Sequence, residues 1–381
     1  MKTYLHGQKF FLANEVKEAG YLDITDGQFG AYQVEKPTEG EIIEYGEQWI
    51  APGLVDTHIH GLVNHDVMDG DFEGLNEISK GLLACGVTSF LPTTLTASTE
   101  ELNQVVEMIG ANQTKVEGAK IAGIYLEGPF FTEKHKGAQN TAYFSDPEIQ
   151  TLENWQKLSN GLIKKIALAP ERAGVPAFVK KATEAGIVVA LGHSDATYDQ
   201  AKAAVDAGAS VFVHTYNGMS PLNHREPGMV GAAMSLPAVF AELICDGHHV
   251  HPVAAEILMD VRGRDHTALI TDCMRAGSMP DGDYTLGEFP VIVKDGMAKL
   301  HSGSLAGSVL KLKEAIKNVV DWGIATPAEA IQMATSVPAL SCKIADSCGE
   351  ISPGRAADFI VLNSDMTLQA TFLDGKCRFE K

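Results

Sequence analysis

Between residue 53 and about residue 275, short apolar runs alternate with longer stretches that have helical periodicity. The runs are rich in Val, Ile and Leu, which is typical of parallel strands buried on both faces. The stretches between them, such as "FEGLNEISKGLLACG", often end at a glycine, a common residue just after a helix. Eight such alternations predict an α/β fold, the TIM barrel. The eight predicted strands are "GLVDTHIHG", "TSFLPTT", "IAGIYLEG", "KIALAPE", "GIVVALGH", "SVFVHTYN", "FAELICDG" and "TALITDC".

The two ends of the chain have a different pattern. Short β segments broken by turns fill the start of the chain, and Thr25-Asp26-Gly27 is a hairpin signal. The end of the chain is similar, with a second hairpin signal at Asp374-Gly375. We therefore expect β structure at residues 1–52 and 346–381, and the barrel at residues 53–345.

Acids and histidines lie where the predicted barrel strands end. Six of the eight runs end in such a residue. The carboxyl ends of all strands in a parallel barrel face one mouth, where the active sites of this fold are built. We therefore expect these side chains to converge: His58, His60, Glu127, Glu171, His193, His214 and Asp272.

Such a set of side chains is suited to metal binding. Imidazoles and carboxylates are the usual ligands of Zn²⁺ and similar ions, and this set is large enough for one or two ions. The pair His58 and His60 alone would also be compatible with two hydrogen-bonded interior histidines. Asp272 has an alternative as a helix N-cap, and Glu171 as a structural group that holds a loop. The joint pattern over several strand ends favours a metal centre.

Composition narrows the classes of partner. The 381 residues carry a formal charge of −19, from 49 acidic and 30 basic residues. This charge repels phosphate backbones and anionic membranes, so we expect no nucleic-acid and no membrane partner. No apolar run approaches the roughly 20 residues of a spanning helix, and the start lacks a signal-peptide core. Six scattered cysteines form no Cys-x-x-Cys pair, so we expect reduced thiols and a cytoplasmic protein.

Several motifs carry a resemblance over nearly the whole chain. They are "APGLVDTHIHG", "YLEGPF", "LGHSDAT", "VHTYNGMSPLNHREPG", "ICDGHHVHP", "LITDCMRA", "LAGS" and "GEISPGRAADFIVLN". With them the chain resembles the amidohydrolase superfamily and, within it, the N-acetylglucosamine-6-phosphate deacetylase family. The resemblance implies a barrel whose flanking N- and C-terminal strands form a small β-sandwich. It also implies metal-dependent hydrolysis of N-acetyl-D-glucosamine 6-phosphate to D-glucosamine 6-phosphate and acetate, in amino-sugar catabolism.

The resemblance assigns roles to the strand-end residues. The ligands of the family's principal metal match Glu127, His193 and His214. His58 and His60 match a second site, with Glu127 bridging and Asp272 close to it. We therefore expect one or two divalent ions, with Zn²⁺ favoured and Fe²⁺ or Mn²⁺ as alternatives. Asp272 is expected to take a proton from the attacking water and to pass it to the leaving amine.

The resemblance also implies substrate contacts and a homodimer. The matching residues are Ala138, Gln139, Asn217, Gly218, Arg225, His249, Leu305, Ala306, Gly307 and Ser308. Arg225 is expected to reach the neighbouring subunit's site, where it and His249 would bind the phosphate. Gln139 stands where family members often have a histidine, so it offers a hydrogen bond but no charge. His135 lies too early to match and is expected at the surface.

Other interpretations stay open. The same reaction on N-acetylgalactosamine 6-phosphate differs at one hydroxyl group. Hydrolases of cyclic amides, such as dihydroorotase or hydantoinase, bridge two metals with a modified lysine at the end of strand four, whereas here Lys165 lies at the start of that strand. A non-catalytic sugar-phosphate sensor would lack the acid–base residue or the ligands. In "SGSLAGSVLKLKEAI", Ser304 or Ser308 has an alternative as a helix N-cap.

Overall fold

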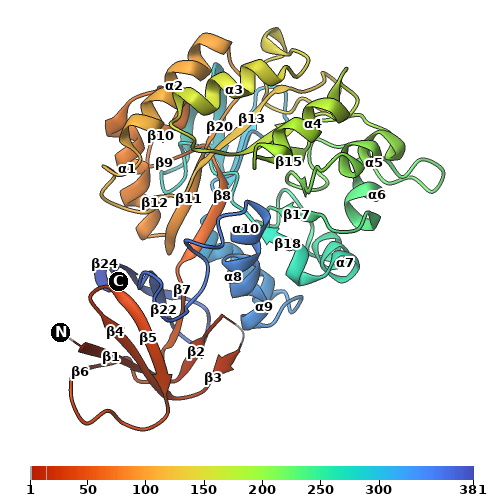
Figure 1. The fold of residues 1–381 in the computed structure, drawn as a ribbon. Helices are drawn as coiled ribbons and strands as arrows, with labels where there is room; N and C mark the ends of the chain where they lie inside the picture. Colours follow the sequence, from red (N-terminus) through yellow and green to blue (C-terminus); the bar gives the residue numbers. More distant parts are fainter. Residues whose placement is uncertain (1, 14) are drawn as a thin grey trace.

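The largest sheet of the protein is a barrel of parallel strands (Figure 1). The computed structural model describes residues 2–13 and 15–381. Eight parallel strands lie at the eight predicted runs, which confirms the TIM barrel. In barrel order they are β8 (Leu54–Ile59), β11 (Val87–Thr94), β13 (Ile124–Phe130), β14 (Ile163–Leu168), β15 (Val188–Leu191), β16 (Val211–Phe212), β17 (Phe240–Leu243) and β18 (Thr267–Leu269). The short strand β12 (Lys120–Ile121) pairs with β11.

The first and last strands nearly close this barrel. Ile59, at the end of β8, forms a parallel bridge with Cys273, beyond the end of β18. The amide N–H of Asp272 donates to the carbonyl oxygen of His58 at 2.9 Å, and that of His60 donates to the carbonyl oxygen of Cys273 at 2.8 Å. Two segments at opposite ends of the barrel sequence therefore share one edge of the mouth.

Helices follow the barrel strands and surround them (Figure 1). They are α1 (Phe72–Leu83), α2 (Thr99–Asn112), α3 (Ile149–Leu158), α4 (Val175–Glu184), α5 (Tyr198–Asp206), α6 (Gly228–Ser235), α7 (Pro252–Arg262) and α8 (Leu312–Asp321), with α9 (Pro327–Met333) and α10 (Ser336–Ser341) beyond them. Short 3₁₀ turns lie at η1 (Val67–Asp69), η2 (Thr141–Tyr143) and η3 (Arg264–His266). The N-cap of α8 is Lys311, so the alternative that Ser304 or Ser308 caps this helix is wrong.

Side chains fill the barrel interior near the amino ends of its strands. The amide N–H of Val55 donates to the carbonyl oxygen of Ala334 at 2.9 Å, which ties β8 to the α9–α10 segment. Residues of α10 and the following segment enter one buried cluster with inward-facing strand residues: Ala339, Cys342, Ile344 and Cys348, with Val55, Leu91, Tyr125, Ala167, Val188, Ala190, Val211 and Val213. This packing leaves the opposite mouth, at the carboxyl ends of the strands, as the place for a site.

The two β-rich ends form separate sheets beside the barrel, and both termini lie there (Figure 1). One sheet has the order β5 (Gln28–Gln33), β4 (Gly20–Thr25), β1 (Lys2–Gly7), β6 (Glu41–Glu44). The other has the order β24 (Lys376–Glu380), β23 (Leu368–Leu373), β22 (Phe359–Leu362), β7 (Trp49–Pro52), β2 (Lys9–Phe11), β3 (Val16–Lys17). A shared core, with Leu22 and Phe29 from one sheet and Phe359 and Phe372 from the other, joins them as a sandwich.

Both predicted hairpins are confirmed. Asp26 and Gly27 connect β4 to β5, and Asp374 and Gly375 connect β23 to β24. All of these turn residues have positive φ, between 49° and 78°, as a two-residue type I′ turn requires. The six cysteines are free, as expected. None of the helices that the structure describes has the length and apolar character needed to cross a bilayer.

An antiparallel sheet between β18 and α8 lies outside the predicted elements. It consists of β19 (Gly282–Leu286), β20 (Phe289–Lys294) and β21 (Met297–Leu300). Its buried residues Leu286, Val291, Val293 and Ala298 pack with barrel-mouth residues, among them Leu95, Ala138, Met274 and Ala306. The sheet therefore forms one wall of the mouth. A small pair, β9 (Gly61–Leu62) and β10 (His65–Asp66), follows β8.

Candidate metal centre and active site

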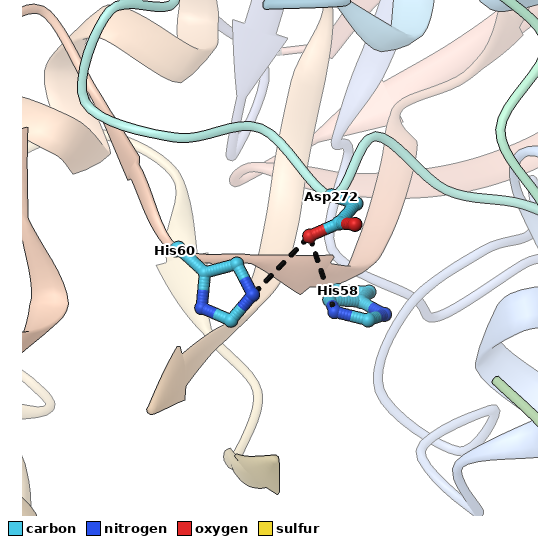
Figure 2. A group of neighbouring side chains, drawn as sticks. All are labelled: His58, His60 and Asp272. Carbon is cyan, nitrogen blue, oxygen red and sulfur yellow. Dashed lines mark ion pairs between the residues drawn. The ribbon is translucent and has the colours of Figure 1, made fainter. Parts of the chain in front are cut away.

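Six ligand-type side chains meet at the mouth of the barrel in two groups. One group is His58, His60 and Asp272, and the other is Glu127, His193 and His214. Within each group the potential ligand atoms lie within 4.8 Å of one another, and all six residues are buried. Figure 2 shows the first group, with the Asp272 carboxylate directed at both imidazoles, at 3.2 Å from His60 Nε2 and 3.5 Å from His58 Nε2.

Glu127 joins the two groups. Its Oε1 lies 3.5 Å from Nε2 of His58, 3.2 Å from Nε2 of His193 and 3.4 Å from Nε2 of His214. Its Oε2 lies 3.3 Å from Nε2 of His60. Each oxygen of this single carboxylate thus faces imidazole nitrogens, a geometry in which Glu127 can serve both groups.

Each of the four imidazoles points Nε2 toward the centre and Nδ1 toward an oxygen acceptor. For three of them the acceptor is a backbone carbonyl: Thr93 for His60 at 3.2 Å, His135 for His193 at 3.0 Å and Asn217 for His214 at 3.0 Å. His58 Nδ1 instead lies 3.2 Å from Oε2 of Glu242. A proton on Nδ1 satisfies every one of these contacts and leaves the Nε2 lone pair free to bind a cation.

The backbone at the centre is strained. His193, His214 and Asp272 have φ values of 45°, 27° and 50°, in the left-handed region that non-glycine residues seldom adopt. Each such residue costs on the order of 1–3 kcal/mol, and such residues are found most often at functional sites. Hydrogen bonds hold Asp272 in place, because its carbonyl oxygen accepts the amide N–H of Ser308 at 2.7 Å.

Electrostatics in the metal-free chain favour charged groups here. Burial opposes protonation of His58, but the nearby Asp272 and Glu127 carboxylates outweigh it and raise the pKa of His58 to about 9. Burial likewise disfavours a charged Glu127, but His58 and the other imidazoles hold the pKa of Glu127 well below its usual range. The carboxylates of Glu127 and Asp272 are therefore ionised at neutral pH, and their negative charge attracts a cation to the centre.

The donors present fit a divalent cation. His58 Nε2 is buried and has no hydrogen-bond partner within residues 2–13 and 15–381. A buried polar atom without a partner is costly, and a cation is the ligand that this nitrogen, the other imidazoles and the two carboxylates share. Neutral imidazole nitrogens with carboxylates suit Zn²⁺, Fe²⁺ and Mn²⁺.

A cavity of about 300 Å³ opens above this centre. Cluster residues His60, Glu127, His193, His214 and Asp272 line it, together with Ala138, Gln139, Asn217, Gly218, His249, Leu305 and Gly307. Gln139 uses both ends of its amide inside the protein: its Nε2 donates to Glu127 Oε2 at 2.7 Å, and its Oε1 accepts the amide N–H of Thr96 at 2.9 Å. The volume is at the lower end of the range for small-molecule sites.

The remaining predicted site residues lie elsewhere. Arg225 is exposed, in the segment before α6. Ala306 packs in the core of the mouth wall, and the Ser308 hydroxyl donates to the carbonyl oxygen of Thr271 at 2.6 Å. Glu171 is outside both metal-type groups, because its carboxylate accepts from Thr132, Ser194 and the amide of Asp195 at 2.5–2.8 Å. Glu171 therefore has the structural role that was the alternative for it, because its carboxylate holds a loop.

Sequence reasoning missed three residues near the centre. His135 has a partly exposed side chain that pairs with Asp195, but it also lines the cavity, and its carbonyl oxygen accepts from His193, which the sequence did not predict. Lys165 and Glu242 form a fully buried ion pair under the centre. A signal was present for Glu242, which is the one charged residue in the otherwise apolar strand β17, whereas Lys165 lies next to Lys164 in β14 and its residue type alone does not set it apart.

Comparison with known proteins identifies the family. A family model described as the amidohydrolase family matches residues 49–378. The chain belongs to the amidohydrolase family. This amidohydrolase is 42% identical over 341 residues to the N-acetylglucosamine-6-phosphate deacetylase of Vibrio furnissii, covering 89% of this chain and 85% of that protein. It is 39% identical over 365 residues to the N-acetylgalactosamine-6-phosphate deacetylase of Escherichia coli O157:H7, covering 94% and 96%.

Solved structures resemble this amidohydrolase over its full length. A mutant of N-acetyl-D-glucosamine-6-phosphate deacetylase from Mycobacterium smegmatis, in complex with N-acetyl-D-glucosamine-6-phosphate, superposes with a TM-score of 0.93 at 28% identity, covering 99% of each chain. The N-acetylglucosamine-6-phosphate deacetylase from Thermotoga maritima superposes with a TM-score of 0.88 at 28% identity, covering 100% of each chain.

We expect cation binding to this amidohydrolase to release protons. Because the pKa of His58 is raised to about 9 in the metal-free chain, its imidazole is protonated at neutral pH and must lose a proton to coordinate. Titration calorimetry at neutral pH, in two buffers of different ionisation enthalpy, should report net proton release. The apparent affinity should rise with pH until that pKa is passed, and an affinity that is flat with pH would contradict the expectation.

Proposed function

We propose that this chain hydrolyses the acetamido group of N-acetyl-D-glucosamine 6-phosphate, releasing acetate and D-glucosamine 6-phosphate, in amino-sugar catabolism. The observation that carries the proposal is the gathering of four imidazoles and the Asp272 carboxylate around Glu127 at the floor of a small-molecule cavity. The relative from Vibrio furnissii, at 42% identity, bears the name of this activity.

In this proposal the two groups of side chains hold two divalent cations. Glu127, His193 and His214 hold the first, and His58, His60 and Asp272 hold the second, with Glu127 facing both. Zn²⁺ is favoured, with Fe²⁺ and Mn²⁺ as alternatives. A cation bound here would acidify water and polarise the acetyl carbonyl group.

Asp272 is the proposed acid–base residue. Burial opposes its ionisation, but His58 and His60 outweigh burial and lower the pKa of Asp272, so its carboxylate is available as a base at neutral pH. It accepts a proton from the water that attacks the acetyl carbon. It then donates this proton to the sugar nitrogen as the carbon–nitrogen bond breaks, so that a neutral amine leaves.

The cavity lining suggests how the substrate lies. The acetamido group must reach the centre, so the sugar occupies the space beside Asn217 and Gly218 on one side and Leu305 and Gly307 on the other. His249 lines the same cavity, and its Nδ1 lies 2.7 Å from Oδ2 of Asp246, which orients its ring. Its remaining nitrogen, Nε2, can donate to the phosphate when the ring carries a proton on both nitrogens.

We propose a homodimer in which Arg225 completes the phosphate site of the neighbouring subunit. The segment that carries Arg225 projects from the barrel beside α6 (Figure 1). Next to it, α7 presents an apolar stripe to the outside, with Val253, Ile257 and Val261 exposed to 56%, 49% and 58%. Exposed apolar side chains one helical turn apart are typical of a surface that a partner covers.

Three alternatives rank below this proposal. N-acetylgalactosamine 6-phosphate is the second candidate substrate, because a relative at 39% identity is named for it. A cyclic-amide hydrolase would need a modified lysine among the ligands, whereas Lys165 is fully buried in an ion pair with Glu242. A non-catalytic sensor is disfavoured because the ligand set and Asp272 are intact. We also propose a cytoplasmic location, which six free cysteines support.

Acetate release tests the substrate. We expect the metal-loaded protein to deacetylate N-acetyl-D-glucosamine 6-phosphate with a higher kcat/KM than its galactose epimer, measured by an acetate assay on samples of known metal content. A higher kcat/KM for the epimer would move the assignment to the second candidate. Cleavage of neither compound would overturn the proposed function.

Asp272→Asn tests the acid–base role. The amide cannot accept the proton, so kcat should fall by about 10²–10⁴-fold, the range for loss of general acid–base catalysis. Substrate affinity, measured by calorimetry, should persist, because asparagine has nearly the same shape as aspartate and the other residues that line the cavity are unchanged. Asp283→Asn, at an exposed position on β19, is the matched control. A kcat for Asp272→Asn near that of the control would remove Asp272 from the proton transfer.

Complementation tests whether Arg225 acts on the neighbouring site. Arg225→Ala and Asp272→Asn should each inactivate a homodimer. In a mixed dimer, the subunit that retains Asp272 receives Arg225 from its partner. Co-expression of the two variants should therefore restore about a quarter of wild-type activity, since half of the dimers are mixed and each has one complete site. An Arg225 that acts within its own subunit would give no restoration.

A further inference from the structure

A lysine and a glutamate form an ion pair inside the barrel, directly under the metal-type groups. Lys165 lies on β14 and Glu242 on β17, and both side chains are fully buried. Lys165 Nζ donates to Glu242 Oε1 and, at 3.3 Å, to the carbonyl oxygen of Thr57. The ring of Tyr125 lies against the same ammonium group, with its centroid 3.7 Å from Nζ.

Stability alone does not account for this pair. Desolvation of two buried charges offsets most of their attraction, and apolar residues of similar volume often replace such pairs without loss of stability. The neighbouring barrel interior is filled by apolar side chains such as Val55, Ala167 and Val188. Apolar side chains could therefore have filled these two positions as well. The contacts of the pair indicate what else it does.

The pair contacts the metal centre through one imidazole. Glu242 Oε2, the oxygen not bonded to Lys165, accepts the Nδ1–H of His58 at 3.2 Å. The other three imidazoles donate to backbone carbonyls. A carboxylate on the far nitrogen of a ligand histidine fixes the tautomer and the ring orientation, and it makes the imidazole a stronger donor to a cation.

We propose that Lys165 and Glu242 form a buried relay that positions His58 and thereby sets the affinity of the second cation site. This inference rests on the proposed two-cation function. Glu242 holds the His58 ring with Nε2 directed at Asp272 and Glu127, 3.5 Å from each. Lys165 neutralises Glu242 and fixes its carboxylate. Its bond to the Thr57 carbonyl oxygen also anchors the strand residue just before His58.

The relay acts on one site only. Over the part of the chain that the structure describes, the hydrogen bonds and ion pairs of the Lys165 and Glu242 side chains go to each other, to His58 and to the Thr57 carbonyl oxygen, and not to Glu127, His193 or His214. The two histidines of the first group are oriented instead by the carbonyl oxygens of His135 and Asn217. Loss of the relay should therefore weaken the second cation and spare the first. A pair with only a structural role would affect both sites equally, or neither.

The relay is tested by removing both of its charges together. Glu242→Gln removes the carboxylate but leaves Lys165 as an unpaired buried cation, which can cost enough stability to prevent folding. The double variant Lys165→Met/Glu242→Gln removes both charges at similar volume. Tyr125→Phe is the matched control, because the Tyr125 hydroxyl is buried in the same place and has no hydrogen-bond partner in the described part of the chain.

The readout is stepwise cation affinity of the folded, metal-free full chain, measured by Zn²⁺ titration against a competing chelator. We expect wild type and Tyr125→Phe to bind two Zn²⁺ ions. The double variant should bind the first ion as wild type does and the second about 10–100-fold more weakly, as expected for loss of a carboxylate behind a ligand histidine. At subsaturating Zn²⁺, its kcat should fall and then recover as Zn²⁺ is raised.

The outcomes separate the relay from the proposed function. A second-site affinity of the double variant within about twofold of wild type, against the 10–100-fold expected, overturns the relay and leaves the deacetylase proposal intact. A wild-type chain that binds one Zn²⁺ ion overturns the relay too, while hydrolysis with a single cation stands. A wild-type chain that binds no Zn²⁺, Fe²⁺ or Mn²⁺ overturns the proposed function itself.

Discussion

The site depends on closure of a parallel barrel. Because Ile59 at the end of the first strand pairs with Cys273 beyond the last, His58 and His60 come to lie beside Asp272. Without that contact the two imidazoles would face an open sheet edge, and Asp272 would belong to a loop with no partner. Closure also puts Glu127, on a neighbouring part of the rim, within reach of both groups. One backbone constraint thus assembles a site from residues far apart in the chain.

The same closure brings several buried charged side chains close together, and two arrangements compensate their charges. At the mouth, carboxylates and imidazoles face one another around the space that a cation fits, and three of these residues are held in left-handed backbone conformations. Deeper in the barrel, Glu242 is neutralised by Lys165. Burial makes each charge costly alone, so every one of them is placed against an opposite charge or a hydrogen-bond partner. The wall of the mouth formed by β19–β21 instead packs through apolar residues.

Much of this architecture could be predicted from local patterns. The barrel strands lie at the predicted runs because strands buried on both faces must be apolar, and the hairpins lie at Asp-Gly turns because few other pairs accept positive φ twice. The sheet β19–β21 was missed, since its strands are half exposed and vary in pattern. His135 was missed because its contribution is a backbone carbonyl, for which residue type carries no signal.

The sequence by itself determined the strand and helix order, the kinds of ligand at the strand ends and the family to which the chain belongs. Those features follow from residue type and spacing, which act over a few neighbours. Only the tertiary structure decided which ligands share Glu127, that Glu171 holds a loop instead of joining them, and that Lys165 reaches Glu242 behind His58. Contacts of this kind depend on barrel closure and on the depth of each side chain in the barrel, and no local pattern encodes either.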